Sequence, residues 1–310
     1  MAGYVLYNGF WNREPPDPVR RLSQAGARLG VALRPVPNTA FISEFTGGSA
    51  LPRTRVVGPD GPLSAADFVL CWDKDVRLLR AMEACGTRVY NTADSVALCD
   101  DKAATHRVLS DAGLPMPRTF VAPMTYVSYD SPGDGFLQAA AGALGFPLVC
   151  KECFGSLGEQ VYLARDEGEL FALARRMGPR PFLLQEFVRP AGEDYRLYVV
   201  GGRVEAAMRR HSDHDFRANI GAGGTGERYV PTPEEESLAR RCCEALGLGF
   251  AGIDLLHDAH GRPLVCEVNA SAHMAALTAC TGIDVAERIV RLVRGRESTR
   301  PAPAGPPLSP

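Results

Sequence analysis

The sequence predicts a fold of the α/β (α+β) class with more than one folding unit, on three observations. Within residues 1–90, short apolar runs alternate with helical patterns in a βαβαβ order, which is typical of an open, mostly parallel sheet. From residue 182 onward, strand-like runs predominate. The chain has 310 residues, and at about 100–200 residues per domain this length corresponds to two or three folding units.

The first part of the chain is expected to begin with a strand at Tyr4–Tyr7. Asp17 followed by Pro18 is a typical helix start, because aspartate caps a helix N-terminus and proline suits the first turn. Gly30 then provides a C-cap. A strand, a helix ending before Gly86 and a third strand follow at Phe68–Trp72, Val76–Cys85 and Arg88–Tyr90.

The rest of the chain also divides into regular elements and breakers. A helical pattern over residues 94–113 ends in the breaker GLPMPRT. A helix, two strands around a glycine-rich loop and a second helix are expected at Phe136–Leu144, Pro147–Glu152, Val161–Ala164 and Glu167–Met177. Later strands read PFLLQEFV, DYRLYVV, RVEAAMR, FAGIDLLH and PLVCEVN, with a hairpin turn at Gly201-Gly202, a glycine-rich loop IGAGGTGERYVP, and helices at Pro233–Leu246 and Val285–Arg294.

Composition argues against several classes of protein. The formal net charge of −2 and the pI of about 6.3 lack the basic excess of a protein that binds nucleic acid or an anionic membrane. No stretch approaches the roughly 18 apolar residues of a membrane span. The N-terminus lacks the pattern of a signal peptide, so we expect a cytoplasmic protein. After Arg296, five prolines in fourteen residues predict a disordered tail.

The nine cysteines are an odd number, which favours reduced, buried thiols over a disulfide framework. Cys150 and Cys153 form a C-x-x-C that could indicate redox chemistry or zinc. They fall in a predicted strand, where residues three apart point to opposite faces, and no second C-x-x-C exists. We therefore favour a structural role for both.

Lysine is rare in this chain. Of 34 basic residues, only Lys74, Lys102 and Lys151 are lysines, which leaves 31 arginines. Genomic base composition could explain the skew alone. The alternative is that lysine persists where a compact ammonium binds phosphate as a point charge, a role that the planar guanidinium does not match.

The last predicted hairpin carries three oxygen-bearing side chains. If Asp258–Gly261 forms a four-residue turn, Asp254 opposes Val265, and then Asp254, Glu267 and Asn269 share one face of the sheet. Three hard oxygen ligands on a strand pair are typical of a magnesium site, with a solvated strand face as the alternative. Because close carboxylates need a counterion or a proton, we favour the metal site.

Three further segments are candidates for nucleotide contacts. After Lys151 the chain reads ECFGSLGEQV, in which the glycines and Ser156 would let backbone N–H groups approach an anion, although a plain hairpin remains the alternative. The strand end QEFV, followed by Glu193-Asp194, suits adenine and ribose contacts, but could be any strand end. Arg210 and Arg217 could act as guanidinium clamps on a transferring phosphate.

Taken in order, these motifs resemble the ATP-grasp superfamily, and most closely its RimK-type branch of carboxylate–amine ligases. The shared features are a lysine before a helix, a lysine followed by GSxG, and then QEFV, GxDxR, DFRAN…GG, GIDLL and CEVNAS. The resemblance covers about residues 91–294 and implies an ATP-grasp fold. It implies a pre-ATP-grasp domain at 1–98, a central subdomain with the phosphate loop at 99–184, a C-terminal subdomain with the metal site at 185–295, and the tail at 296–310.

The resemblance also implies roles for individual residues. Lys102, Lys151 and Ser156 would bind the phosphates of ATP. Glu186 and the backbone of Phe187 and Val188 would hold adenine, with Asp194 on the ribose. Asp254, Glu267 and Asn269 would bind two Mg²⁺ ions, which Mn²⁺ could replace. Arg217, Asn219 and Arg210 would lie near the γ-phosphate and the acyl group.

The implied activity is ATP-dependent formation of an amide bond through an acyl phosphate, adding L-glutamate or a similar amino acid to a carboxylate-bearing peptide or small molecule. The alternatives are a small-molecule kinase and a nonenzymatic ATP-binding regulator. The intact metal and arginine positions count against the regulator. The resemblance is compatible with a dimer or tetramer.

The sequence departs from the family pattern at three places. Glu159-Gln160 stands where close relatives often have a further glycine. The segment after Asn269 reads ASAHM, placing His273 in a stretch that lies beside the acceptor in this family. The connection to DFRAN is one residue shorter, which makes Arg210 the less secure of the two arginine assignments.

Overall fold

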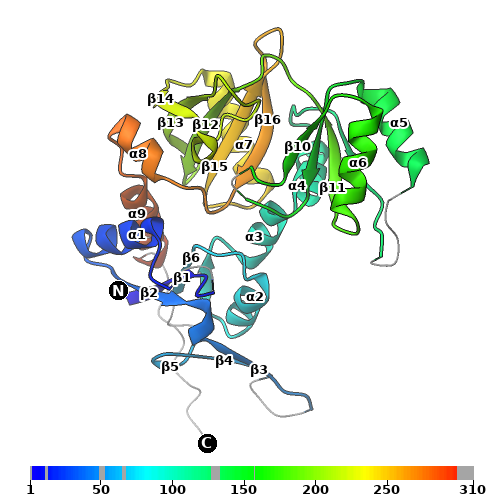
Figure 1. Cartoon of the computed structure of the whole chain (residues 1–310). Helices are drawn as coiled ribbons and strands as arrows, with labels where there is room; N and C mark the ends of the chain where they lie inside the picture. Colours follow the sequence, from blue (N-terminus) through cyan, green and yellow to red (C-terminus); the bar gives the residue numbers. More distant parts are fainter. Residues whose placement is uncertain are drawn as a thin grey trace, which may run out of the picture.

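The computed structural model describes residues 2–10, 13–48, 53–64, 68–126, 133–156 and 158–298. These residues form three larger sheets and one small sheet, each with helices or loops around it (Figure 1). We call the larger ones the N-terminal, central and C-terminal sheets. No helix of this described part is long and apolar enough to cross a membrane.

The N-terminal sheet has the order β2-β1-β6-β7, and its strands are all parallel. Its strands are β1 (Ala2–Tyr7), β2 (Ala32–Pro37), β6 (Phe68–Cys71) and β7 (Arg88–Tyr90), connected through α1 (Asp17–Arg28) and α2 (Val76–Ala84). The predicted parallel sheet is confirmed. Strand β2 was not predicted, because two prolines interrupt its sequence, and it is tolerated because β2 lies at the sheet edge.

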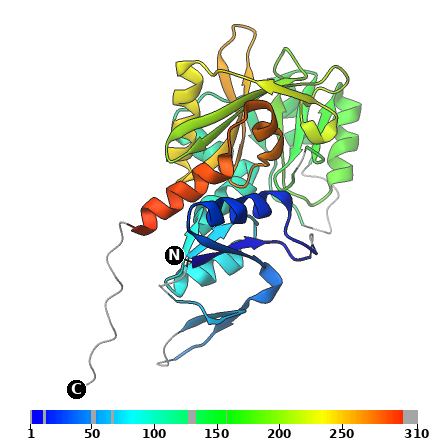
Figure 2. The ribbon, with the colours of Figure 1, turned by 90° about the vertical axis from the view of Figure 1, so that its left-hand side faces the viewer.

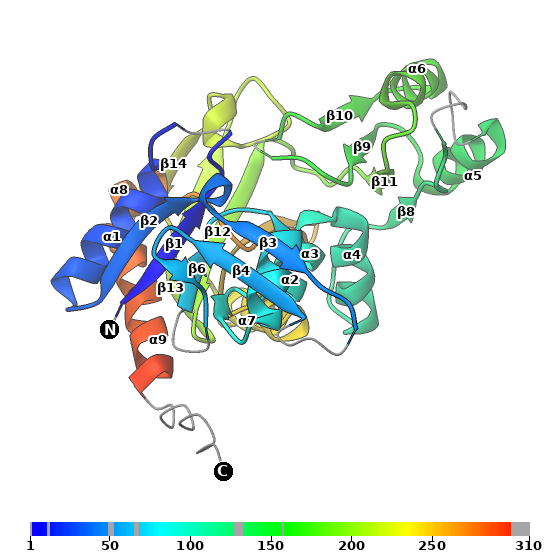
Figure 3. The same ribbon diagram turned by 90° about the horizontal axis from the view of Figure 1, so that it is seen from below.

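Two details of this part correct the sequence analysis. Pro16 occupies the N-cap position of α1, while Asp17 is the first helical residue and pairs with Arg21, whose Nε lies 2.6 Å from the carboxylate. A small antiparallel sheet that was not predicted projects from this part of the molecule (Figure 1), and its strands lie nearest the viewer in Figure 3. It contains β3 (Ile42–Phe45), β4 (Thr54–Gly58) and β5 (Gly61–Pro62), after the short 3-10 helix η1 (Asn38–Ala40).

The predicted helix over residues 94–113 is in fact two helices, α3 (Ala93–Asp100) and α4 (Lys102–Asp111). Asp101 ends the first and caps the second, because its carboxylate accepts hydrogen bonds from the N–H groups of Ala103 and Ala104. The break places Lys102 at the first position of α4, where its own N–H donates to the carbonyl of Cys153.

The central sheet has the antiparallel order β10-β9-β11-β8, with α5 (Asp134–Leu144) and α6 (Glu167–Met177) packed against it. Its strands are β8 (Thr119–Val121), β9 (Leu148–Glu152), β10 (Val161–Ala164) and β11 (Phe182–Glu186). The buried side chains of this sheet and its two helices form a separate hydrophobic core that includes Leu148, Leu170 and Leu184.

The C-terminal sheet has the antiparallel order β14-β13-β12-β15-β16. Its strands are β12 (Glu193–Val200), β13 (Arg203–His211), β14 (Thr225–Arg228), β15 (Phe250–His257) and β16 (Pro263–Asn269). The helices of this part are η2 (Ile220–Ala222), α7 (Pro233–Ala245), α8 (Ala275–Thr281) and α9 (Val285–Ser298). Strand β14 lies in the segment that the sequence analysis treated as a glycine-rich loop, and α8 was not predicted.

The two faces of the C-terminal sheet are covered differently. Leu197 and Val199 share a core with side chains of α7, whereas Tyr198 and Val200 share a core with side chains of α8 and α9. Both cores also contain side chains of the N-terminal sheet, and α9 packs along α1 (Figure 2). The N-terminal and C-terminal sheets are therefore built on continuous apolar packing.

The expected domain limits meet the described elements at two points. The limit between residues 98 and 99 falls inside α3. Helix α9 continues to Ser298, three residues beyond the expected end of the C-terminal subdomain at 295. The rest of that expected tail, residues 299–310, lies outside the described residues.

Candidate functional site

The hairpin of β15 and β16 places the three predicted metal ligands on one face, but in a different register from the expected one. Asp254 lies opposite Glu267, not Val265, and His257 lies opposite Pro263. The register shifts beside Asp254 because Cys266 is an extra residue on β16, which makes a β-bulge. Asn269, two residues beyond Glu267, points to the same side.

Four side chains on β12, β13 and β15 form a row of opposite charges on this face. Asp194 and Arg196 alternate along β12 and therefore point the same way. Arg210 of β13 lies opposite Asp194, and Asp254 of β15 lies opposite Arg196. All four side chains of this row line one or both of the cavities described below, so the row is available to a ligand.

The charged row is buried and tightly paired. Arg196 donates Nε and Nη2 to the two oxygens of Asp254, at 2.7 and 2.6 Å. Arg210 donates to both oxygens of Asp194 and reaches Asp254 Oδ2 at 2.9 Å. Burial alone would raise the pKa of the Asp254 carboxyl, but the two guanidiniums outweigh it and hold that pKa at about 2.

Two adjoining cavities open along this row. The first lies between the central and C-terminal sheets, and the second lies between the C-terminal sheet, α3 and the segment of Lys74. The first has a volume of about 100 Å³ and the second about 330 Å³. They share four lining residues, Ser156, Arg210, Asn219 and Glu267, which define the junction between them. The structure thus brings all thirteen predicted site residues to these two cavities, and all except Asn269 line the first: Lys102, Lys151, Ser156, Glu186, Phe187, Val188, Asp194, Arg210, Arg217, Asn219, Asp254 and Glu267.

The two lysines of the first cavity come from different elements. Lys102 begins α4, and its Nζ lies 3.3 Å from Glu267 Oε1. Burial raises the pKa of the Glu267 carboxyl, but the charges of Lys102, Lys151 and Arg196 together outweigh burial and lower that pKa overall. Lys151 belongs to β9, and its Nζ lies 3.7 Å from Cys266 Sγ, the thiol that the β-bulge directs into the cavity. Both ammonium groups are available to an anion in this cavity.

The glycine-rich loop after β9 uses its own side chains to hold its shape. Gln160 Oε1 accepts a hydrogen bond of 3.0 Å from the N–H of Ser156. A Cβ atom on Gly155 would lie 2.4 Å from the same Gln160 oxygen, so a larger residue there would displace Gln160 from this hydrogen bond. The departure from the family pattern at Gln160 is therefore structural, and a phosphate would take the N–H of Ser156 from this side chain.

Arg217 fastens the glycine-rich loop to the C-terminal sheet. It pairs with Asp215 at 2.7 Å and donates from Nη1 to the carbonyl of Gly158 at 2.6 Å. Gly158 has a positive φ of +78°, a conformation that favours glycine. Arg217 therefore lines the first cavity while its guanidinium is bonded to the glycine-rich loop and to Asp215.

The far end of the first cavity is lined by the residues that follow β11. Phe187 packs near Phe216, with ring centroids 6.3 Å apart, and Val188 follows it along the wall. Glu186 is exposed and accepts a hydrogen bond from the N–H of Arg118 at 3.1 Å. Asp194 lines the cavity, but both of its oxygens are bonded to Arg210, so a ribose contact would have to share them.

The residues present fit a hard divalent cation. Among the described residues, no three histidine, cysteine or acidic side chains are arranged as a metal site, so a cation here depends on an amide oxygen as well. Asn269 Nδ2 is buried with no hydrogen-bond partner; this nitrogen is a donor, so the atom of Asn269 that would bind a cation is Oδ1. Asp254 already accepts three of the roughly four bonds that a carboxylate can accept, so one position is left. Glu267 supplies the third oxygen donor.

His106 supports both walls of the first cavity from behind. Its Nδ1 lies 2.7 Å from the carbonyl of Lys102, and its Nε2 lies 2.9 Å from Gln185 Nε2. Gln185 in turn donates to Thr119 Oγ1 at 2.9 Å. Burial, with the nearby Lys151 charge, lowers the pKa of His106 to about 4, so the imidazole is neutral at pH 7.

We expect His106 to make folding stability pH-dependent below neutrality. The unfolded imidazole has a pKa of about 6.5, so the unfolded chain binds a proton before the folded one as the pH falls. The stability that neutral His106 contributes is complete above about pH 6.5 and is lost toward pH 4. Urea unfolding at pH 7 and 4.5 should show wild type losing about 2–3 kcal/mol more than His106→Gln. Parallel losses in the two proteins would contradict this assignment.

The second cavity lies under the segment that follows β16. Gly252 of β15 permits this segment to approach, because a Cβ atom there would lie 2.5 Å from Ala272 Cβ. His273 and Asn269 line the cavity together with Arg196. Burial, followed by the charge of Arg196, lowers the pKa of His273. The family departure at His273 is therefore located at this second cavity.

The sequence analysis missed several residues of the site. Arg196 forms an ion pair with Asp254 and was given no role. The alternation of side chains along the strand GEDYR was a signal that Asp194 and Arg196 share a face. The sequence analysis named Gln160 as a departure from the family pattern and Lys74 as one of three rare lysines, but it placed neither in the site, because their contacts depend on loops that meet in space. Cys150 and Cys153 are both buried free thiols, as the structural interpretation predicts.

Over most of its length the chain is similar in sequence to known proteins. A model of the RimK-like ATP-grasp domain matches residues 99–293. Beta-citrylglutamate synthase B of Danio rerio is 35% identical over 217 residues, which is 69% of this chain and 52% of that protein, so the chain spans about half the length of this relative. A probable alpha-L-glutamate ligase of Thioalkalivibrio sulfidiphilus is 36% identical over 228 residues, or 72% of each chain.

A solved structure shows the same arrangement over almost the whole chain. The ATP-grasp ligase PsnB complexed with a minimal precursor, Mg and ADP superposes with a TM-score of 0.68 at 18% identity, covering 96% of this chain and 98% of that chain. At this identity the likeness concerns the fold, and it extends over the N-terminal sheet as well as the central and C-terminal sheets.

Proposed function

Because the chain belongs to the RimK-like ATP-grasp family, we propose that it is an ATP-dependent carboxylate–amine ligase that adds L-glutamate, or a similar amino acid, to an acceptor with a carboxylate group. The curated relatives are named for glutamate ligation, one with a citryl acceptor. The substrates of this chain are inferred from those names and from its own site.

The observation that carries the proposal is the pair of cavities that share a charged junction. A ligase of this kind must bring the γ-phosphoryl group of ATP against the carboxylate of a second substrate. The first cavity has an apolar end at Phe187 and Val188 and a cationic end at Lys102 and Lys151, which suits a nucleotide. The second cavity meets the cationic end only, at the four shared residues.

In the first step, a carboxylate oxygen of the acceptor attacks the γ-phosphorus atom, ADP leaves, and an acyl phosphate forms. Phosphoryl transfer needs positioning and charge neutralisation more than a covalent catalyst. Lys102, Lys151 and the N–H of Ser156 would hold the phosphate chain. Arg210, Arg217 and Asn219 would lie beside the transferring group, and Arg210 and Asn219 border both cavities.

In the second step, the amine of the amino acid attacks the acyl carbon, phosphate leaves, and the nitrogen loses a proton as the amide forms. The chain offers cations close to the oxygen that becomes negative in this step, because Arg196 and Arg210 both line the second cavity. No side-chain nucleophile is needed. His273 borders the same cavity and is the residue we assign to the side of the incoming substrates.

Magnesium, when bound, would neutralise phosphate charge and polarise the bonds that break. Asp254, Glu267 and Asn269 would hold it, and we propose two ions, with Mn²⁺ able to replace them. The adenine would contact Glu186, Phe187 and Val188, and the ribose Asp194.

We further propose that residues 99–184 and 185–295 hold the nucleotide between them, while residues 1–98 close the second cavity. We propose a cytoplasmic location, in line with nine cysteines that are all free thiols. A homo-oligomer, as a dimer or tetramer, is proposed from the family alone.

The test is phosphate release by the purified protein with ATP, Mg²⁺ and L-glutamate, across a matrix of carboxylate acceptors that includes citrate, N-acetylated amino acids and short peptides. Mass spectrometry should find a product one water lighter than its two substrates. Hydroxylamine added in place of glutamate should trap the acyl phosphate as a hydroxamate. A phosphorylated product without release of phosphate would instead identify a small-molecule kinase.

A further inference from the structure

We propose that Lys74, which lies between β6 and α2, binds the γ-phosphoryl group of ATP from the side of the N-terminal sheet. This inference rests on the proposed nucleotide site in the first cavity. It gives a ligand to the one lysine that has no role in the proposed function. It also places the N-terminal part of the chain in direct contact with the reacting group.

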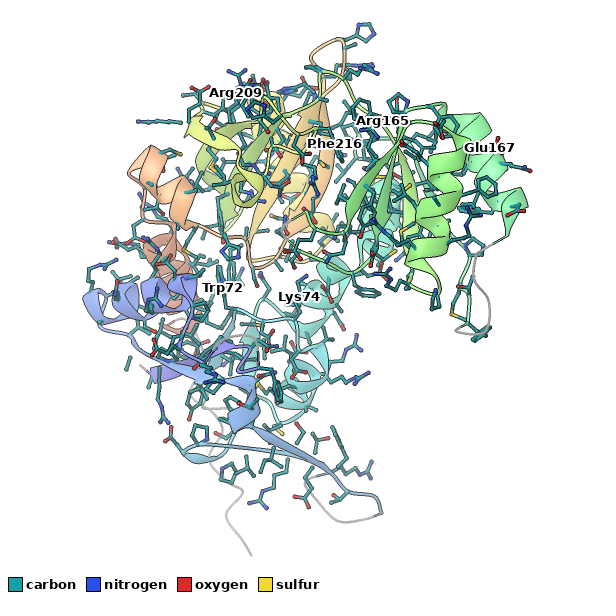
Figure 4. The ribbon with its side chains drawn as sticks, in the orientation of Figure 1. Trp72, Lys74, Arg165, Glu167, Arg209 and Phe216 are labelled. Carbon is teal, nitrogen blue, oxygen red and sulfur yellow. The ribbon has the colours of Figure 1, made fainter. Side chains whose placement is uncertain are left out.

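Lys74 reaches the glycine-rich loop from outside the central and C-terminal sheets. Its Nζ lies 3.3 Å from Ser156 Oγ and 3.3 Å from the carbonyl of Gly155, across more than 80 residues of sequence. The same nitrogen lies 2.6 Å from Asp100 Oδ1 of α3. Figure 4 shows Lys74 at the edge of the N-terminal part that faces the other two sheets.

The position of Lys74 relative to the two cavities indicates which phosphate group of ATP it would contact. Lys74 lines the second cavity and not the first, whereas Lys102 and Lys151 are in contact with the first. A nucleotide that enters with its base at Phe187 and its phosphates at the two inner lysines reaches the junction with its last phosphate. Ser156 is a junction residue, and the Lys74 ammonium lies 3.3 Å from its hydroxyl. The charge of Lys74 therefore acts on the γ-phosphoryl group.

Fold stability does not account for this lysine. The side chain of Lys74 is 45% exposed and that of Asp100 is 22% exposed, and such an ion pair contributes at most about 1 kcal/mol. The chain has 31 arginines and three lysines, and the other two lysines both line the proposed phosphate site. A compact ammonium can turn its three donors from Gly155, Ser156 and Asp100 to phosphate oxygens, which a rigid guanidinium fork cannot do in the same space.

The experiment compares a triphosphate and a diphosphate, so that it needs no acceptor. Calorimetric titration of the full chain with Mg²⁺-AMPPNP and Mg²⁺-ADP is done for wild type, Lys74→Ala, Lys74→Arg and the control Arg80→Ala. Arg80 belongs to α2, pairs with Asp94 on the surface and lines neither cavity. Thermal unfolding of each variant checks that the fold is kept.

We expect Lys74→Ala to weaken AMPPNP binding about 10- to 100-fold, the usual range for one charge-assisted hydrogen bond. Its affinity for ADP should change less than about twofold, since no γ-phosphate is present. Lys74→Arg should lose less than Lys74→Ala because it keeps the charge, and Arg80→Ala should match wild type for both nucleotides.

Two results would overturn the inference while leaving the proposed function in place. Equal losses for AMPPNP and ADP would mean that Lys74 only shapes the loop, and unchanged affinity for both would mean that it makes no contact with the nucleotide. Failure of the wild-type protein to bind either nucleotide would instead remove the proposed function, and the inference with it.

Discussion

Replacement of Glu267 by alanine is expected to lower kcat by about a thousandfold or more while the protein remains folded. Glu267 is the only proposed metal ligand that borders both cavities, and its carboxylate faces Asp254 across the hairpin. Its loss removes an oxygen ligand and a negative charge from the junction. The measurement is phosphate release under saturating ATP, together with Mn²⁺ binding in the presence of ADP, which reports the metal site without turnover.

Two variants make the Glu267 result specific. Glu267→Gln keeps an oxygen and the side-chain shape, so it should bind Mn²⁺ more weakly than wild type but better than Glu267→Ala. Glu244→Ala removes an exposed carboxylate of α7 that pairs only loosely with Arg240, at 3.9 Å, and should leave activity unchanged. Near wild-type Mn²⁺ affinity in Glu267→Ala would show that Glu267 is not a metal ligand.

Replacement of Lys151 by alanine is expected to weaken the binding of ADP and AMPPNP alike, by about 100-fold, and to abolish turnover. Lys151 is buried on β9, between two paired strands, so its ammonium is held in place before the nucleotide arrives. Its Nζ lies 3.7 Å from the thiol of Cys266, a weak acceptor that a phosphate can readily replace. Calorimetry with both nucleotides measures the effect.

The matched control for Lys151 is Arg165→Ala, which removes a cation just after β10. Arg165 is 68% exposed and pairs with Glu169, and it lines neither cavity. It should bind both nucleotides as wild type does. Retention of near wild-type ADP affinity in Lys151→Ala would exclude the proposed phosphate contact. The expected result for Lys151→Ala, weaker binding of both nucleotides, differs from that for Lys74→Ala, in which only the affinity for the triphosphate is expected to fall.

The sequence predicted the local elements of the site better than the pairings between them. Glu267 and Asn269 were placed on one face with Asp254 because alternation along a strand is a local property. The register was wrong because the bulge at Cys266 depends on how β16 packs, which no turn length specifies. Arg196 and Asp254, which form a bidentate ion pair, are 58 residues apart in the sequence. The order of their strands in the sheet cannot be read from either strand alone.

Two misassigned elements show where local signals were present but not decisive. The break between α3 and α4 follows from Asp101, whose side chain caps the second helix, and the pair of aspartates before Lys102 was a readable signal. Strand β2 contains prolines, which argue against a strand until the edge position is known. The helix break is therefore a local property of the sequence, whereas strand β2 depends on its position at the edge of the sheet.

The separate core of the central sheet determines what it would cost to open the nucleotide cavity. Leu148, Leu170 and Leu184 pack among themselves, while the other two larger sheets share their cores. If the central sheet and its helices rotated as one body, little apolar surface would be exposed, because their core is separate from the two cores that the other sheets share. This rotation would break mainly polar contacts at the seam, such as those of Arg217 with Gly158 and Lys74 with Ser156. The main free-energy cost of admitting ATP is thus the loss of these hydrogen bonds. The phosphates of the bound nucleotide can form new hydrogen bonds with the same donors.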